Sequence, residues 1–217
     1  MYENAKNGIG KIFTAQVLAI LGVICTFVAA IFAAVTATAV SENLSGGALG
    51  GSIGLALFTL ASVVFLVLAY ILELVGLNKA GKDEPLIKKA FVAAIFGLIL
   101  SIVLGTLATA TTISWLIDIK DICNFIIGLI IVHHVTYGVA NICPSISDKA
   151  MNVWKVYMAT IILAIVVNIV TIVLSLLGLY TSSAILVLVF AIVDAILQLV
   201  AYVMFVSFLG KAKKEIN

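Results

Sequence analysis

The chain has 217 residues, of which 64% are hydrophobic and 10% are charged, and its formal net charge is +2. Soluble globular domains carry about 45–50% apolar and about 25% charged residues, so this composition excludes a water-soluble fold. The net charge is too small to imply a nucleic-acid partner. All twelve basic residues are lysines, which lowers the expectation of a nucleotide or phosphate enzyme.

Six apolar stretches are long enough to cross a bilayer, whose hydrocarbon core requires roughly 20 apolar residues of helix. The sequence therefore predicts an all-α integral membrane bundle of six transmembrane helices, a single domain over residues 1–217 surrounded by the lipid bilayer. In chain order, the predicted spans run from about Lys11 to Val40, Ser52 to Leu77, Leu86 to Ile117, Ile122 to Ile142, Asp148 to Leu179, and Ala184 to Leu209.

The first two connections have different compositions. The glycine-rich segment Gly46–Gly54 predicts a flexible turn that leads into a close helix crossing. The segment Asn78–Pro85 is the clearest loop of the chain. Pro85 suits the first turn of a helix, where its missing N–H costs nothing, and Asp83 or Glu84 can cap that turn.

Charged and turn residues also separate the later spans. Asp118–Asp121 predicts a break between the third and fourth helices. Pro144 ends the fourth helix, and Ser145–Asp148 has capping-box spacing for the start of the fifth. Thr181–Ser183 turns the chain into the sixth helix.

The lysines predict the orientation. With a cytoplasmic amino terminus, every lysine except Lys120 lies on the cytoplasmic side, and the positive-inside rule favours this arrangement. We therefore expect a multi-pass protein of the cell membrane with both termini in the cytoplasm. The cytoplasmic set consists of Lys6, Lys11, Lys79, Lys82, Lys88, Lys89, Lys149, Lys155, Lys211, Lys213 and Lys214.

Internal similarity predicts three tandem helical hairpins, over approximately residues 1–80, 81–143 and 144–217. The stretch Val67–Tyr70, which leads to Asn78–Asp83, resembles Leu199–Tyr202, which leads to Gly210–Glu215. Such repeats are common in transporters, but simple duplication also yields them in scaffolds.

The stretch from Val75 to Phe91 (VGLNKAGKDEPLIKKAF) resembles the signature loop of an uncharacterised prokaryotic family of multi-span membrane proteins, a domain of unknown function. Gly8-Ile-Gly10, before the first span, is also similar. The resemblance covers roughly the first half of the chain and implies a prokaryotic membrane. It implies no activity, cofactor or catalytic residue.

Strongly polar side chains inside the predicted spans form the candidate site. Asp194 lies near the middle of the sixth span, where a carboxyl group is costly, and Gln198 lies one turn later on the same face. Asn168 is central in the fifth span, and His133 and His134 lie in the inner half of the fourth. These residues could line a proton or cation site, or they could form hydrogen bonds between helices.

We expect no metal, cofactor or catalytic residue. The adjacent histidines project about 100° apart, and neither has a histidine or carboxylate three or four residues later. Cys25, Cys123 and Cys143 lie at different depths, which argues against a disulfide framework.

Small residues recur every four positions on two helices, and in lipid such stripes allow helix backbones to approach closely. They predict contact with neighbouring helices, in the same chain or in another protomer. The helix-packing residues are Gly22, Thr26, Ala30 and Ala34 in the first span, and Ala93, Gly97, Ser101 and Gly105 in the third.

Three classes of function follow. The first is an interaction or accessory membrane protein that forms a homo-oligomer or binds another membrane protein through its small-residue faces. The alternative is a small transporter or channel that uses Asp194 and the neighbouring polar groups. The third is a membrane enzyme acting on lipid substrates. This class ranks last, because the sequence shows no cluster of acidic or basic residues at a membrane interface.

Overall fold

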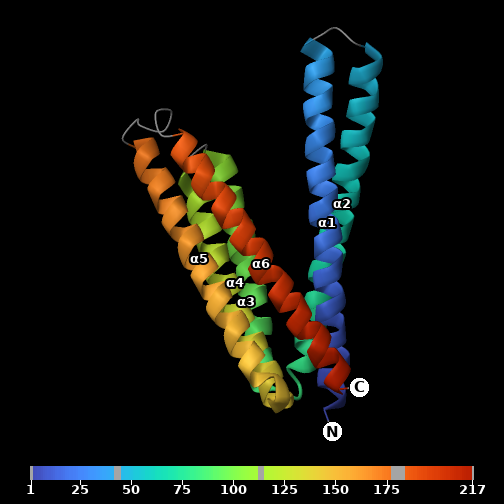
Figure 1. Cartoon of the computed structure of the whole chain (residues 1–217), viewed down its shortest axis with the longest axis vertical. Coiled ribbons are helices and arrows are strands. Elements are labelled where there is room, and N and C mark those ends of the chain that lie inside the picture. Colours follow the sequence, from blue (N-terminus) through green and yellow to red (C-terminus); the bar gives the residue numbers. More distant parts are fainter. Residues whose placement is uncertain (1, 42–44, 112–114, 177–183, 217) are drawn as a thin grey trace. The chain divides into compact units, whose positions relative to one another are not determined.

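The computed structural model describes residues 2–41, 45–111, 115–176 and 184–216, and every element within these ranges is helical (Figure 1). In lipid, a helix satisfies all of its backbone hydrogen bonds internally, which is why the long apolar stretches adopt this structure. The elements are α1 (Glu3–Ser41), α2 (Ser45–Ala80), α3 (Pro85–Thr111), α4 (Trp115–Ile142), the 3₁₀ turn η1 (Pro144–Ile146), α5 (Ser147–Leu176) and α6 (Ala184–Ile216).

The six α-helices are long and apolar enough to cross a membrane. The chain is therefore a multi-pass membrane protein of the all-α class, as its composition predicts. The shortest helix, α3, has 27 residues, or about 40 Å at a rise of about 1.5 Å per residue. That length exceeds the roughly 30 Å of hydrocarbon that a span must cross.

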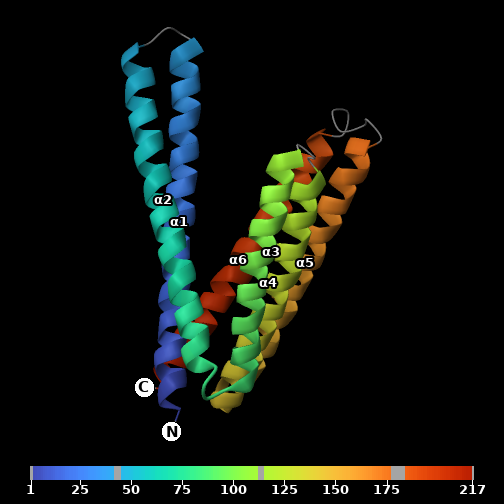
Figure 2. The ribbon, with the colours of Figure 1, turned by 180° about the vertical axis from the view of Figure 1, so that it is seen from behind.

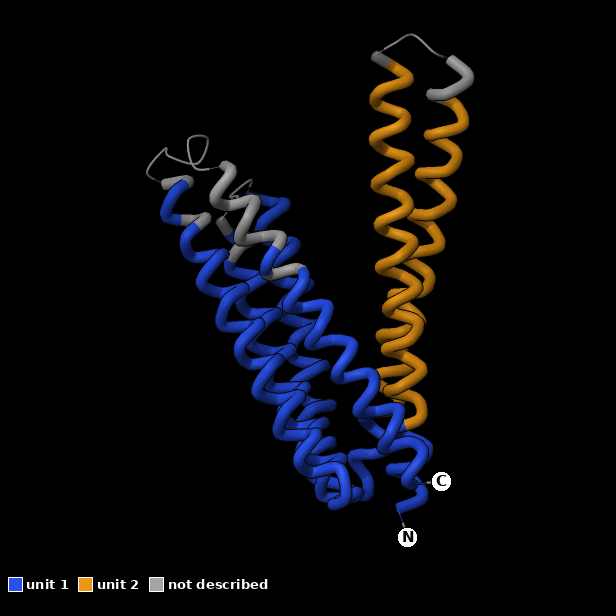
Figure 3. The backbone as a smooth tube through the Cα atoms, viewed as in Figure 1, with its two compact units in different colours: residues 1–9, 77–217 blue, residues 10–76 orange. Residues whose placement is uncertain are grey.

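The sequence predicts a single domain, whereas the chain divides into two compact units (Figure 3). The first unit contains residues 1–9 and 77–217, and the second contains residues 10–76. One boundary falls inside α1 and the other inside α2. The beginning of α1 and the end of α2 therefore belong to the larger unit.

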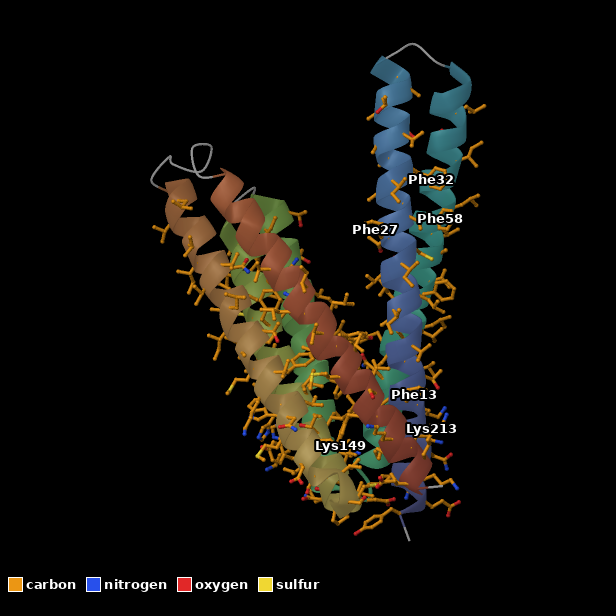
Figure 4. The ribbon with its side chains drawn as sticks, in the orientation of Figure 1. Phe13, Phe27, Phe32, Phe58, Lys149 and Lys213 are labelled. Atoms are coloured by element: carbon orange, nitrogen blue, oxygen red, sulfur yellow. The ribbon has the colours of Figure 1, made fainter. Side chains whose placement is uncertain are left out.

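The smaller unit is an antiparallel pair formed by α1 and α2, which lie side by side in both views (Figures 1 and 2). Phe32 of α1 stacks on Phe58 of α2, with ring centroids 5.6 Å apart (Figure 4). At Gly54, an added Cβ atom would lie 2.5 Å from the ring of Phe32. The glycine therefore lets α2 approach the aromatic ring closely.

In the larger unit, α3 packs on α4, α4 packs on α5, and α5 packs on α6. Consecutive helices are thus neighbours in space, as in the predicted succession of hairpins. The turn η1 contacts α4, α5 and α6 at one end of this unit. Ile146 of η1 is buried there.

The helix bounds differ from the sequence predictions in two places. Residues 115–121 belong to α4, so the polar segment Asp118–Asp121 lies within this helix and does not separate two spans. Ser45–Gly54 belongs to α2 and is helical, so the prediction of a flexible turn over Gly46–Gly54 is wrong. The predicted close helix crossing is present, because Gly51 and Gly54 both pack against α1.

Candidate functional site

The structure separates the polar residues that the sequence grouped as one candidate site. Asn168 of α5 is half-buried, and its side-chain amide donates a hydrogen bond of 2.8 Å to the carbonyl oxygen of Ala164, one turn earlier in the same helix. Gln198 is half-buried in α6. The backbone of Asp194 belongs to α6, and its side chain lies outside the part of the chain whose side chains are described.

His133 and His134 occupy different environments on α4. The ring of His133 packs edge-on against Trp154 of α5 at a centroid distance of 4.6 Å, and it also contacts Tyr137. Nδ1 of His134 lies 2.8 Å from the carbonyl oxygen of Ile130 in its own helix. His133 thus contacts aromatic rings of α4 and α5, whereas His134 interacts with its own helix, so the two histidines have different partners.

The polar residues also lie at different levels along the helices. His133 lies level with Trp154, and Asn168 is 14 residues further along α5, which corresponds to about 21 Å. Tyr157 of α5 contacts Phe205 of the antiparallel helix α6, so the backbone positions 168 and 194 lie at similar depths. The histidines are therefore remote from the level that Asn168 and Asp194 share.

The small residues of α1 near its middle contact α2. At Gly22, an added Cβ atom would lie 2.8 Å from the Cγ atom of Leu66. The hydroxyl of Ser62 in α2 donates a hydrogen bond of 3.0 Å to the carbonyl oxygen of Gly22. The hydroxyl groups of Thr26 and Ser62 are 2.6 Å apart. Gly22 and Thr26 thus form part of a polar contact between the two helices.

The stripe leaves this contact further along α1. Ala30 and Ala34 are exposed, whereas Ala29 is buried. Residues four apart on an α-helix are offset by about 40°, because each residue turns the helix by about 100°. Between Gly22 and Ala34 the stripe therefore rotates by about 120°, which carries its later members away from α2.

On α3, Gly97 and Ser101 in the middle of the stripe contact α4. Ala93 is half-buried. At Gly97, an added Cβ atom would lie 2.9 Å from Ile127 of α4. The hydroxyl of Ser101 donates a hydrogen bond of 2.6 Å to Oδ1 of Asn124. An added Cβ atom at Gly105 would meet no atom within 4 Å, so Gly105 contributes no close contact.

Asp83 in the loop between α2 and α3 caps the beginning of α1. Its carboxylate accepts a hydrogen bond of 2.9 Å from the side chain of Asn4 and one of 2.8 Å from the backbone N–H of Ala5. The first N–H groups of a helix have no partner within the helix, so Asp83 satisfies a donor that would otherwise need water. The hydrogen bonds from Asn4 and Ala5 lower the pKa of Asp83 below its usual value of 3.8.

We expect acid to destabilise the protein partly through Asp83. A carboxyl group with a lowered pKa stabilises the folded state above the pKa of the unfolded chain, and this contribution disappears as the pH falls through the folded pKa. The relevant range therefore begins at about pH 4 and extends downward. Thermal unfolding in detergent should show a smaller loss of stability between neutral and acidic pH for Asp83→Asn than for the wild type.

Asp148→Asn is the control for this measurement, because Asp148 is an exposed carboxylate in the first turn of α5 and forms no hydrogen bond or ion pair with another described residue. It should retain the acid sensitivity of the wild type. Equal pH dependence in the wild type and Asp83→Asn would contradict the assignment of Asp83 as the cap.

Glu84, the residue before α3, connects two helices. Its Oε1 atom accepts a hydrogen bond of 3.2 Å from the backbone N–H of Leu86 and another of 3.2 Å from the side chain of Asn141 in α4. The first of these bonds confirms the prediction that Asp83 or Glu84 caps the third helix. At Gly138, an added Cβ atom would lie 3.1 Å from Cγ of Glu84 and 2.6 Å from Ile87. The glycine leaves room for the buried glutamate.

Ser145 does not form the predicted capping box at the start of α5. Its hydroxyl instead donates a hydrogen bond to the carboxylate of Glu215 near the end of α6. The residue that precedes η1, Cys143, forms no side-chain cap, and Pro144 needs none because it has no N–H group. The end of the chain is thereby attached to the turn between α4 and α5.

Lysines and carboxylates gather at this end of the larger unit, where α2 and α6 end and α3 and α5 begin. Lys120 lies near the start of α4, at the other end of that helix, and its Nζ atom is 3.5 Å from Oδ1 of Asp121. The lysines near the shared end are Lys79, Lys82, Lys88, Lys89, Lys149, Lys211, Lys213 and Lys214.

Among the side chains that the structure describes, no three histidine, cysteine, aspartate or glutamate residues gather where they could hold a metal ion. Besides the contacts of Thr26 with Ser62 and of Ser101 with Asn124, the structure brings together Asp83 with Asn4, Glu84 with Asn141, and Ser145 with Glu215. Sequence reasoning missed the last three of these pairs, because their members lie 57 to 79 residues apart. No protein-family model, curated protein or solved structure matches the chain.

Proposed function

We propose that this multi-pass membrane protein is an interaction or accessory protein that binds a second copy of itself or another membrane protein through its small-residue helix faces. The observation that carries the proposal is the exposure of Ala30 and Ala34 on α1. Gly105 on α3 likewise has open space where a side chain would lie. In lipid, faces of this kind allow a second helix to approach closely.

The intramembrane polar groups give less support to a transport path. Asn168 and His134 direct side-chain atoms toward carbonyl oxygens of their own helices, and His133 contacts aromatic rings. Ionisable groups on an ion pathway face the bundle interior or a water-filled cavity, usually together with a polar partner. We therefore favour the interaction function over transport.

The double substitution Ala30→Leu and Ala34→Leu should weaken self-association by about tenfold, because two bulky side chains would hold a second helix away from α1. The full chain can be labelled with two fluorophores, reconstituted into vesicles and measured by energy transfer over a range of protein-to-lipid ratios. Ile31→Leu together with Val35→Leu is the matched control, since these neighbours are exposed and the two substitutions together add only one methylene group.

Equal association of the two double variants would exclude the alanine face as the interface. If the wild type is monomeric at every ratio and cross-linking in its native membrane captures no membrane protein through this face, the interaction function is wrong.

We further propose that the protein resides in the cell membrane with both termini in the cytoplasm, because all but one of its lysines fall on one side under this topology. Trypsin cleaves after lysine, so the segment Lys79–Lys89 and the final lysines should be cut in inverted membrane vesicles. The same bonds should be protected in right-side-out vesicles. Cleavage of these two regions from opposite sides would contradict the topology.

A further inference from the structure

A groove lies between α5 and α6 near the end of the bundle where α5 begins and α6 ends. Its volume is about 300 Å³. Val153 and Phe208 form its floor and are buried, with 3% and 2% of their surfaces exposed. Lys149 and Lys211 stand on opposite sides of it, one on each helix, and Lys149 is labelled near the start of α5 in Figure 4.

The polar side chains of the groove have no partners in the described part of the chain. Lys149, Asn152, Ser207 and Lys211 are all exposed, and none forms a hydrogen bond or an ion pair with another described residue. Ser207 is unusual in this respect, because threonines in the other helices donate to the carbonyl oxygen four residues earlier. Two ammonium groups, an amide and a hydroxyl are thus available to an external ligand.

In the described part of the chain, no carboxylate forms an ion pair with Lys149 or Lys211. Glu215 instead accepts a hydrogen bond from Ser145 of η1. Asp148 is exposed and forms no ion pair with Lys149. The two unpaired ammonium groups therefore favour an anionic ligand in the groove.

The groove changes from polar to apolar along the helix axis. On α6, Lys211, Ser207 and Val203 follow one another at four-residue intervals and line the same groove. Lys211 and Val203 are separated by about 12 Å along α6, with Val203 on the side of the apolar span. Val203 is 54% exposed, so the deeper part of the groove presents apolar surface to lipid.

We propose that this groove binds an anionic phospholipid. The phosphate of the headgroup lies between the ammonium groups of Lys149 and Lys211, with Asn152 and Ser207 donating hydrogen bonds to its oxygen atoms. One acyl chain lies along Val203 and Met204 toward the hydrocarbon core. A soluble phosphate would use only the polar end, whereas a phospholipid matches both ends of the groove in the order in which they occur.

The test uses the full chain and native mass spectrometry in the presence of equal amounts of phosphatidylglycerol and phosphatidylcholine. The wild type should retain phosphatidylglycerol preferentially. Lys149→Gln together with Lys211→Gln should reduce this preference by at least about tenfold, since each lysine near a membrane surface changes anionic-lipid binding by about fivefold. Lys149→Arg together with Lys211→Arg should retain the preference, because both positive charges remain.

Lys88→Gln together with Lys89→Gln is the charge-matched control, since both lysines are exposed at the start of α3 and lie outside the groove. It should preserve most of the preference. An equal loss in the two glutamine variants would overturn the proposal, because binding would then depend only on total charge.

A further measurement adds excess inorganic phosphate to the wild type with its bound lipid. The phosphate should leave the bound phosphatidylglycerol in place. Displacement of the lipid by inorganic phosphate, or equal retention of both lipids by the wild type, would also overturn the assignment of an anionic phospholipid.

Discussion

Gly51→Leu should destabilise the pairing of α1 with α2 by about 1–3 kcal/mol or more, the usual cost of forcing extra volume into a packed contact. At Gly51, an added Cβ atom would meet the hydroxyl of Thr36 and would lie 3.1 Å from the backbone nitrogen and 3.2 Å from the Cα atom of that residue. Backbone atoms cannot move aside as a side chain can. The two helices must therefore separate.

The neighbouring residue provides a matched control. An added Cβ atom at Gly50 would meet no atom within 4 Å, so Gly50→Leu introduces the same side chain into open space. Thermal unfolding in detergent should give a clearly lower midpoint for Gly51→Leu, while Gly50→Leu should remain within about 1 kcal/mol of the wild type. Equal midpoints for the two variants would show that α1 and α2 do not approach at Gly51.

Glu84→Ala should have the second large effect, a loss of about 2–3 kcal/mol in the free energy of unfolding. The substitution removes the N-cap of α3 and leaves the side chain of Asn141 without its acceptor. Glu84 is buried, with 9% of its surface exposed, so water replaces these bonds poorly. Glu84→Gln should cost less than half as much, because its amide oxygen can accept the same two hydrogen bonds.

A double-mutant cycle with Asn141→Ala separates the two roles of Glu84. The capping bond to Leu86 is lost in Glu84→Ala whether or not Asn141 is present. The interaction between Glu84 and Asn141 contributes only while both side chains remain. A coupling energy of zero between the two substitutions would show that the bond between α3 and α4 does not stabilise the fold.

The helices could be predicted from sequence because hydrocarbon imposes one requirement on every spanning residue, namely an internally bonded backbone. The predicted position of the loop before Pro85 agrees with the structure, since Pro85 begins α3 and Glu84 caps it. Both signals depend only on residues adjacent in the chain.

The errors occur where a distant residue determines the local structure. Gly51 and Gly54 are typical of a turn in isolation, but they pack against Thr36 and Phe32 of α1 and remain helical. Ser145 precedes α5 at the spacing of a capping residue, but its hydroxyl donates a hydrogen bond to Glu215, 70 residues later.

The candidate polar site could be predicted only in part. Depth follows from residue number once a helix is known, so Asn168 and Asp194 could be placed at similar levels of adjacent spans. The environment of His133 could not be predicted, because its contact with Trp154 depends on which faces of α4 and α5 meet. The exposure of Ala30 and Ala34 has a similar origin, since the partner helix occupies a different face of α1.

The cap on α1 also constrains the order in which the chain can be built. Asn4 and Asp83 are separated by 79 residues, and both α1 and α2 lie between them. A growing polypeptide cannot complete this contact until its second span has entered the bilayer and the following loop has left the ribosome. During early synthesis, the first N–H groups of α1 must therefore bond to water. They gain Asp83 as their acceptor only after the first hairpin has formed.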